Sequence, residues 1–186
     1  MKVRNLIPVL LVLVGCLQAE PLPRNVDTLV EQGDMYLDRE TMLPYSGPIF
    51  RLMEDDSSTV QMSTTLKDGL RHGPGEGYYE NGQLGQKGSY SNGERDGPWE
   101  FYYENGQLEQ KGSYSNGEWD GPWEFYYENG QLERKGSYSN GELDGPLEAY
   151  DENGQLMGSG TFSNGEPCGE WFDEGETVTL DPCPGG

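Results

Sequence analysis

Few side chains of this sequence are of the types that perform catalysis. The single histidine, His72, stands at a turn position that aspartates occupy in later copies of a repeated pattern, so we interpret it as a turn residue. No nucleophile elbow, phosphate-binding loop or spaced cluster of metal ligands is present. The acidic residues recur at the spacing of the repeat, which is typical of a solvated face, and weak calcium binding at the acidic turns stays open. We therefore expect no catalytic residues, no metal and no cofactor.

The three cysteines offer different chemistry, and Cys16 belongs to an export signal. Two basic residues precede an apolar run of nine, too short to span a membrane as a helix. The run ends in Leu13-Val14-Gly15-Cys16, which resembles the lipobox of bacterial lipoproteins and implies that Cys16 is lipidated once the signal peptide, residues 1–15, is removed. An ordinary signal peptide cut after Ala19 is the alternative. In a Gram-negative cell, Leu17 in place of Asp favours the outer membrane, facing the periplasm.

Cys168 and Cys183 remain as an even pair in an exported and therefore oxidising context. We predict a disulfide between them that closes a loop of about 15 residues and stabilises the fold by roughly 3 kcal/mol. Metal binding is the weaker interpretation, because two thiols without a neighbouring histidine are too few ligands.

The elements that position these residues are set by a repeat of 24 residues. Residues 97–120 and 121–144 are two copies that differ only at Gln110/Arg134 and Trp119/Leu143. The pattern weakens outward, as expected for an array whose terminal units lack a neighbour on one side. The units that we assign are 47–72, 73–96, 97–120, 121–144, 145–168 and a shortened 169–183.

Each unit is predicted to be a β-hairpin. Two aromatic, alternating segments flank Asn105-Gly106, a dipeptide that favours a two-residue type I′ turn. The cross-strand register follows by counting back from that turn. It pairs Glu104 with Gln107, Tyr103 with Leu108, Phe101 with Gln110, Glu100 with Lys111, and Trp99 with Gly112. A second, longer turn from Asn116 to Pro122 returns the chain to the next hairpin.

The alternation sorts the side chains onto two faces. An apolar face is predicted to hold structural aromatic residues, and a polar face to hold Glu–Lys pairs such as Glu100–Lys111. Trp99 and Trp123 are expected to cover Gly112 and Gly136, the glycines opposite them in the same hairpins. The structural aromatic residues are Trp99, Phe101, Tyr103, Tyr114, Trp123, Phe125, Tyr127 and Tyr138.

The predicted fold class is all-β, an elongated antiparallel meander over residues 33–183, gently coiled. No second layer is evident, so the aromatic face must be closed by coiling, by pairing with another copy or by a ligand. Residues 16–32 are expected to be a tether with a short helix ending at Gly33. Met35–Leu37 and Tyr45 are expected to form a first strand pair.

These residues resemble the MORN repeat variant, of the form G-x-W-x-x-Y-Y-x-N-G-x-L followed by Y-x-N-G-x-x-x-G. The pattern is similar to that of bacterial proteins of the antitoxin-like YwqK family and covers roughly residues 33–175. The resemblance implies an elongated β-meander used as a binding or scaffolding surface. It implies no catalytic residues.

The composition limits the partners. A formal net charge of −21 repels nucleic-acid phosphates and anionic lipid headgroups, so membrane contact is expected only through the N-terminal lipid. We therefore predict a non-catalytic, lipid-anchored envelope protein that binds a protein partner, with an antitoxin-like or immunity-like role as one form of it.

One drifting position is the predicted partner-binding site. The residue after each Asn-Gly-Glu reads Arg95, Trp119 and Leu143 in consecutive units, and we expect these side chains to lie exposed along one edge of the sheet. An aromatic anchor with an acidic rim has the composition of an interaction hot spot and favours a basic partner. Neutral drift at a solvated turn is the alternative.

Glycan binding is the second function that the sequence allows. The pattern also resembles the aromatic hairpin repeats of bacterial cell-wall-binding proteins, which hold ligand between successive units through Trp and Tyr. Those repeats run nearer to 20 residues, and here Trp is absent from units 73–96 and 145–168, so at most two adjacent sites of that kind are expected.

Overall fold

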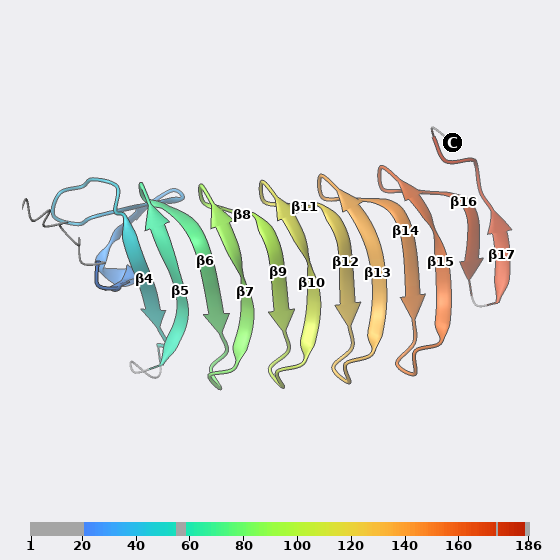
Figure 1. Ribbon diagram of the computed structural model, residues 1–186, viewed down its shortest axis with the longest axis horizontal. Helices are drawn as coiled ribbons and strands as arrows, with labels where there is room; N and C mark the ends of the chain where they lie inside the picture. Colours follow the sequence, from blue (N-terminus) through green and yellow to red (C-terminus); the bar gives the residue numbers. More distant parts are fainter. Residues whose placement is uncertain (1–20, 55–58, 174, 185–186) are drawn as a thin grey trace, which may run out of the picture.

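The computed structural model describes residues 21–54, 59–173 and 175–184. They form one long sheet of consecutive hairpins, in which the strands follow one another in chain order along the length of the molecule (Figure 1). The predicted all-β, elongated meander is confirmed, with one exception at its start. The first strand pairs in parallel with its neighbour, so the sheet is mixed.

Fifteen strands belong to the large sheet. They are β1 (Arg24–Asn25), β4 (Gly47–Leu52), β5 (Val60–Lys67), β6 (Leu70–Tyr78), β7 (Leu84–Ser91), β8 (Glu94–Arg95), β9 (Gly97–Tyr102), β10 (Leu108–Ser115), β11 (Glu118–Trp119), β12 (Gly121–Tyr126), β13 (Leu132–Ser139), β14 (Glu142–Tyr150), β15 (Leu156–Ser163), β16 (Glu166–Asp173) and β17 (Glu176–Thr179). A separate hairpin consists of β2 (Val30–Gln32) and β3 (Met35–Leu37), preceded by the 3-10 turn η1 (Val26–Thr28).

The type I′ turn lies at the other end of the strands from the one that we predicted. Asn116 and Gly117 both have positive φ, 50° and 82°, and join β10 directly to β11. At Asn105-Gly106 only the glycine has positive φ. There the Gly106 N–H donates to the Tyr103 carbonyl at 2.9 Å, and the Asn105 side chain accepts from the Gln107 N–H at 2.8 Å, which makes a wider turn. The sequence rule failed because Asn-Gly occurs in both turns and only flanking residues distinguish them.

The register within the hairpin is confirmed in its body and wrong near the turn. Trp99 lies opposite Gly112, Glu100 opposite Lys111 and Phe101 opposite Gln110, as counted from the sequence. A β-bulge then places Leu108 opposite Tyr102 rather than Tyr103, because the wider turn takes up one more residue.

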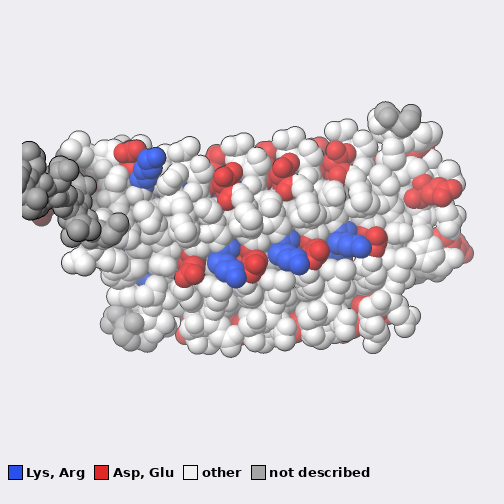
Figure 2. All heavy atoms as spheres, in the orientation of Figure 1, with Lys and Arg blue, Asp and Glu red and all other residues white. Residues whose placement is uncertain are grey.

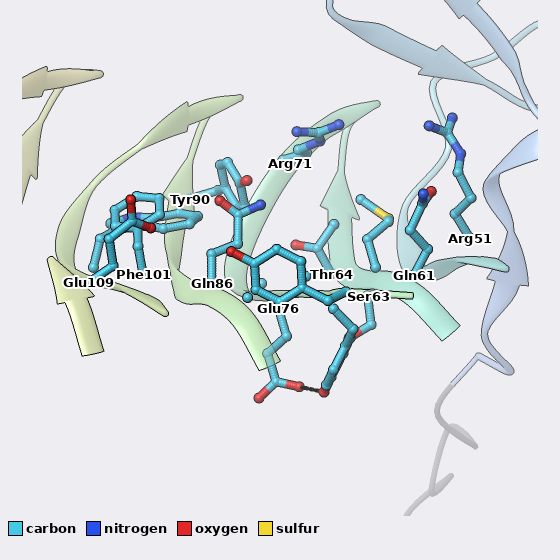
Figure 3. Close-up of a pocket in the computed structure, with 17 residues that line it drawn as sticks. Arg51, Gln61, Ser63, Thr64, Arg71, Glu76, Gln86, Tyr90, Phe101 and Glu109 are labelled. Carbon is cyan, nitrogen blue, oxygen red and sulfur yellow. Dashed lines mark hydrogen bonds between the residues drawn. The ribbon is translucent and has the colours of Figure 1, made fainter. Parts of the chain in front are cut away.

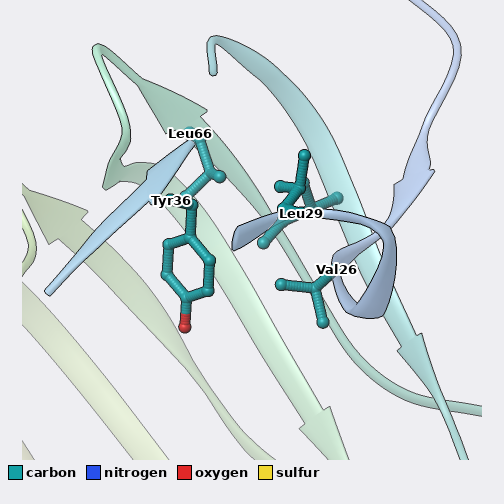
Figure 4. Packing of buried hydrophobic residues seen from close by; sticks show 5 residues of the cluster. Val26, Leu29, Tyr36 and Leu66 are labelled. Carbon is teal, nitrogen blue, oxygen red and sulfur yellow. The ribbon is translucent and has the colours of Figure 1, made fainter. Parts of the chain in front are cut away.

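Residues 24–32, expected to be a tether and a short helix, instead pack against the first unit. β1 pairs with β4, and the predicted helix is reduced to the single turn η1, after which the chain enters β2. Met35–Leu37 pairs with β2, and the predicted contact with Tyr45 is present as a bridge between Leu37 and Pro44 and a hydrogen bond from the Tyr45 N–H to the Tyr36 carbonyl at 3.0 Å. Burial explains the outcome, since this segment covers the open end of the array. Val26, Leu29, Tyr36, Ile49 and Leu66 form its core (Figure 4).

Candidate functional site: the aromatic face

Trp99 and Trp123 each cover a glycine of the preceding unit. An alanine Cβ built at Gly88 would lie 2.2 Å from the ring of Trp99, and one at Gly112 would lie 2.2 Å from the ring of Trp123. The predicted cover within the same hairpin, Trp99 over Gly112, is therefore wrong, although these two residues are backbone neighbours. The ring leans back toward the previous unit, where the Trp99 Nε1–H donates to the Ser89 carbonyl at 2.9 Å. Successive units are joined by this contact.

The rings pack against one another along the sheet and thereby bury themselves. The exposed fraction of Trp99 is 1% and that of Trp123 is 0%. Trp119 stacks on Trp123 with ring centroids 4.3 Å apart and meets Tyr138 edge-on at 4.9 Å. We call this surface the aromatic face. Its buried members are Trp99, Tyr114, Trp123 and Phe125, with Tyr90, Phe101, Trp119 and Tyr138 partly buried beside them.

Tyr103 and Tyr127, predicted to share this face, serve a different purpose. Their hydroxyls donate to the carbonyls of Tyr126 at 2.7 Å and Tyr150 at 2.8 Å, each in the following unit. They lie at the wide turns, where the β-bulge takes them out of the alternation. These two tyrosines thus fasten the turn of one unit to the strand of the next.

The drifting position lies over the tryptophans and not on an exposed edge. The guanidinium of Arg95 lies 4.6 Å from the centroid of the Trp99 ring and donates to the Tyr114 hydroxyl at 3.1 Å. Trp119 and Leu143, one and two units later, are likewise only partly exposed. The prediction of free, exposed side chains is wrong because the tight turn leads the residue directly into a strand, β8, β11 or β14, on the aromatic side.

Several guanidinium groups on the aromatic face have no carboxylate partner. Arg95 and Arg71 lie against aromatic rings, and Arg134 lies 4.0 Å from the centroid of Phe125. None of the three forms an ion pair with any residue that the structure describes. In a chain of net charge −21, this face therefore carries local positive charge.

The opposite face carries the Glu–Lys pairs, and we call it the ladder face. Figure 2 shows lysine and acidic side chains alternating in a line across the strands. The close pairs join neighbouring units, with Lys87 to Glu100 at 2.8 Å and Lys111 to Glu124 at 2.8 Å, whereas we predicted Glu100 with Lys111. Hydrogen bonds from the lysine and from a tyrosine hydroxyl such as Tyr102 lower the pKa of each glutamate below its ordinary value.

A cavity opens on the aromatic face where the first well-formed unit departs from the pattern. Gly75 and Gly77 stand at the positions that Trp99 and Phe101 occupy one unit later. The missing rings leave a cavity of about 420 Å³, with Arg71 and Tyr90 in its wall (Figure 3). Sequence reasoning missed this site. The absent Trp and Phe were visible in the sequence, but we read them only as a weakening of the repeat.

The remaining predicted sites fall outside this face. Cys168 and Cys183 form a disulfide with an S–S distance of 2.04 Å, which fastens β16 to the chain after β17. Cys16 lies outside the described residues. His72, interpreted from the sequence as a turn residue, lies instead within β6, and its Nδ1 atom is buried and makes no hydrogen bond within the described chain. Among those residues, no group of His, Cys, Asp and Glu is arranged to hold a metal ion, and no helix is long and apolar enough to cross a membrane.

The comparison with known families matches the array and its phase. The model of the MORN repeat variant matches residues 71–92, 95–116, 119–140 and 143–164, so that each match runs from one tight turn to the next. The search of curated proteins found no match. Repeats of this family are commonly non-catalytic modules that bind proteins or membranes. The chain thus matches the MORN repeat variant as four tandem repeats between residues 71 and 164.

Proposed function

We propose that this chain is a non-catalytic, lipid-anchored protein of the bacterial envelope whose β-array binds a protein partner on the aromatic face. The observation that carries the proposal is the composition of that face. Partly exposed Phe101, Trp119 and Tyr138 lie beside stacked arginines, and no second layer from the described chain covers them. Aromatic residues and Arg are the types most enriched in interaction hot spots.

The charge distribution favours a protein over a membrane as the partner. A net charge of −21 repels anionic headgroups, so the lipid on Cys16 is the proposed membrane attachment. The acidic turns at the rim of the aromatic face attract basic groups of a partner. The arginines on the face itself attract acidic groups. An antitoxin-like role, implied by the resemblance to YwqK-type proteins, would make the partner a toxin.

Site-specific photocrosslinking in living cells tests the proposal. A photoreactive residue at Arg134 reports on the aromatic face, and the same residue at Lys111 reports on the ladder face two strands away. We expect a discrete protein adduct at position 134 and none at position 111. Adducts at both positions, or only at 111, would place the binding surface elsewhere. Fatty-acid labelling that is lost in Cys16→Ser tests the anchor separately.

The alternative, glycan binding, is favoured by one observation, the cavity beside Gly75 and Gly77. The form of it expected from the sequence, with sugars stacked on tryptophans between units, does not suit Trp99 and Trp123, because their rings are buried. A glycan would have to use the cavity.

A further inference from the structure

The cavity on the aromatic face is a gap in a regular pattern. In the middle units, a tryptophan and a phenylalanine fill the corresponding volume and the residue after the tight turn lies over the tryptophan. In unit 73–96 both rings are replaced by Gly75 and Gly77, and Thr64 stands where the other units have the covered glycine. Neither Gly75 nor Gly77 has positive φ, so the backbone does not require glycine there. The glycines serve packing rather than a turn: Gly75 lies under the Tyr90 ring, which a Cβ there would approach to 2.7 Å, and Gly77 leaves the volume of the missing Phe ring open.

Arg71 has the place of Arg95 but lacks the tryptophan beneath it. Arg95 is held by the Trp99 ring, by the Tyr114 hydroxyl at 3.1 Å and by Gln86 at 3.1 Å. The guanidinium of Arg71 donates to the Tyr36 hydroxyl at 3.4 Å and also interacts with Tyr90, whose ring centroid lies 5.5 Å away. It is half-buried at the edge of the cavity, with no carboxylate partner among the described residues. Most of its donors therefore remain available to an anionic group.

The other walls combine aromatic surface with free amides. Tyr90, Trp99 and Phe101 supply the aromatic surface. The side-chain amide of Gln61 makes no hydrogen bond within the described chain, and Gln86 uses only its oxygen, toward Arg95. A purely apolar side chain of a partner would leave these amides without partners. A sugar ring can contact both kinds of side chain, because the C–H groups on its face pack against aromatic rings and the hydroxyls around its edge hydrogen-bond to amides.

The charges in the cavity fix the orientation of such a ligand. Figure 3 shows Glu109 beside Phe101 at one end and Arg51 at the other, with Arg71 between them. Arg51 is paired with Asp27 at 3.3 Å, and Glu76 is turned away to the Tyr78 hydroxyl. Among the described residues that line the cavity, Arg71 is therefore the arginine without a carboxylate partner, and Glu109 is an acceptor for hydroxyl groups at the far end.

We propose that this cavity binds a sugar ring that bears a carboxylate, with the carboxylate on Arg71, the ring against the aromatic wall and the hydroxyls on the two glutamines. The volume of about 420 Å³ is that of a small-ligand site, in the range of about 300–1,000 Å³ that such sites occupy. This inference goes beyond protein binding by the aromatic face. The two share Phe101 but can be tested separately, because Arg134 and Trp119 do not line the cavity.

Calorimetric titration of the full chain tests the proposal with three probes. Glucuronic acid carries both ring and carboxylate, glucose carries the ring alone, and N-acetyl-glutamate amide carries the carboxylate on a peptide unit. We expect glucuronic acid to bind about tenfold more tightly than glucose, the factor that one charge-assisted hydrogen bond supplies, and more tightly than the peptide probe. No saturable binding of glucuronic acid, or equal binding of glucose, would overturn the proposal. Tighter binding of the peptide probe would overturn it in favour of an acidic peptide.

Two variants and one control locate the site. Arg71→Gln should weaken glucuronic acid about tenfold and change glucose less than about twofold, whereas Arg134→Gln, an arginine of the same face outside the cavity, should change neither. Gly77→Phe restores the ring of the middle units; its Cβ would meet the flexible Gln86 side chain first, and the ring should abolish binding without lowering the melting temperature. Unchanged affinity in Gly77→Phe would refute the location even if Arg71→Gln failed to fold. If glucuronic acid does not bind, the expected crosslinking at position 134 is not affected, so the two proposals can fail separately.

Discussion

At the scale of single residues, the fold depends on contacts between a tryptophan and a glycine one unit apart. Trp123 leaves no room for a side chain at Gly112, and its Nε1–H donates to the Ser113 carbonyl at 3.1 Å. The same position in the next unit, Gly136, faces the methyl groups of Leu143 and Leu147 instead. The glycine is thus required by its neighbour, not by the backbone.

Gly112→Ala should therefore destabilise the protein by about 3 kcal/mol, because a Cβ 2.2 Å from the Trp123 ring forces the ring out of its packed position. Gly136→Ala is the matched control. Its Cβ meets leucine methyl groups at 2.9 and 3.1 Å, which can rotate away, so the loss should be under about 1 kcal/mol. Chemical denaturation measures both. Equal losses would mean that the ring contact is not what excludes a side chain.

The residues also show what sequence reasoning could and could not reach. Period-2 alternation assigned Trp99, Phe101 and Tyr114 to one face and the Glu–Lys pairs to the other, as the structure has them. The alternation could not tell whether a tryptophan ring leans over its own hairpin or over the previous one, because the strands on both sides of it carry a glycine in the neighbouring position. For the same reason it paired Glu100 with Lys111 when Lys87 is closer.

At the scale of the elements, the ladder face joins neighbouring hairpins through ion pairs whose strength depends on pH. The pKa of Glu100 is lowered and that of Lys87 is raised, chiefly by the hydrogen bond between them. A lowered carboxylate pKa stabilises the fold above the ordinary value of 4.5, and this contribution is lost as pH falls through the folded value. A raised lysine pKa stabilises below 10.5 and is lost at higher pH. The pair should be fully effective between about pH 5 and 10.

A double-mutant cycle on Lys87→Gln and Glu100→Gln should give a coupling energy of about 0.2–1 kcal/mol at pH 7, the value for exposed pairs. We expect this coupling to decrease as the pH falls below 4.5 and to vanish once the carboxylate is protonated, at a pH lowered by the hydrogen bond from Lys87. The coupling energy from the cycle excludes the effect that each single substitution has through the net charge of the protein. Lys111 with Glu100 is the control pair and should couple more weakly at pH 7, because Lys111 is paired with Glu124. A pH-independent coupling would contradict the assignment.

The turns explain the limits of prediction for whole elements. Both turns of a unit contain Asn-Gly, and the sequence rule selected the wrong one as type I′. The distinction lies in context. At Asn105 the side-chain amide donates to the Glu128 carbonyl of the next unit at 3.3 Å, a contact that exists only in the array. The N-terminal segment was mispredicted for a similar reason, since Val26 and Leu29 are buried only because they cover the end of the sheet.

At the scale of the whole molecule, each unit contacts mainly the units before and after it, so the array should tolerate loss of an entire unit. Deletion of residues 97–120 brings Trp123 over Gly88 in place of Gly112 and leaves Arg95 to cover Trp123 in place of Trp119, because the two middle units are almost identical. We expect a folded chain, shorter by about 10 Å, with lower stability. Small-angle scattering measures the length of the molecule, and thermal unfolding measures its stability.

The control for that deletion removes residues 97–108, which is one strand and one wide turn. It breaks the alternation of strand direction, so the sheet cannot reconnect and the chain should lose cooperative unfolding. A compact globular radius for the full chain, or unfolding of the 24-residue deletion, would contradict the picture of an array held by nearest neighbours.

The proposed binding role of the aromatic face can be measured most directly by oxidative footprinting of aromatic side chains, read by mass spectrometry. The comparison is between the purified chain and the chain in its native envelope. We expect Phe101, Trp119 and Tyr138 to be protected in the envelope, whereas Tyr102 and Tyr126 on the ladder face should react equally in both states. Protection of the ladder-face tyrosines, or unchanged reactivity of Trp119, would contradict a partner on the aromatic face.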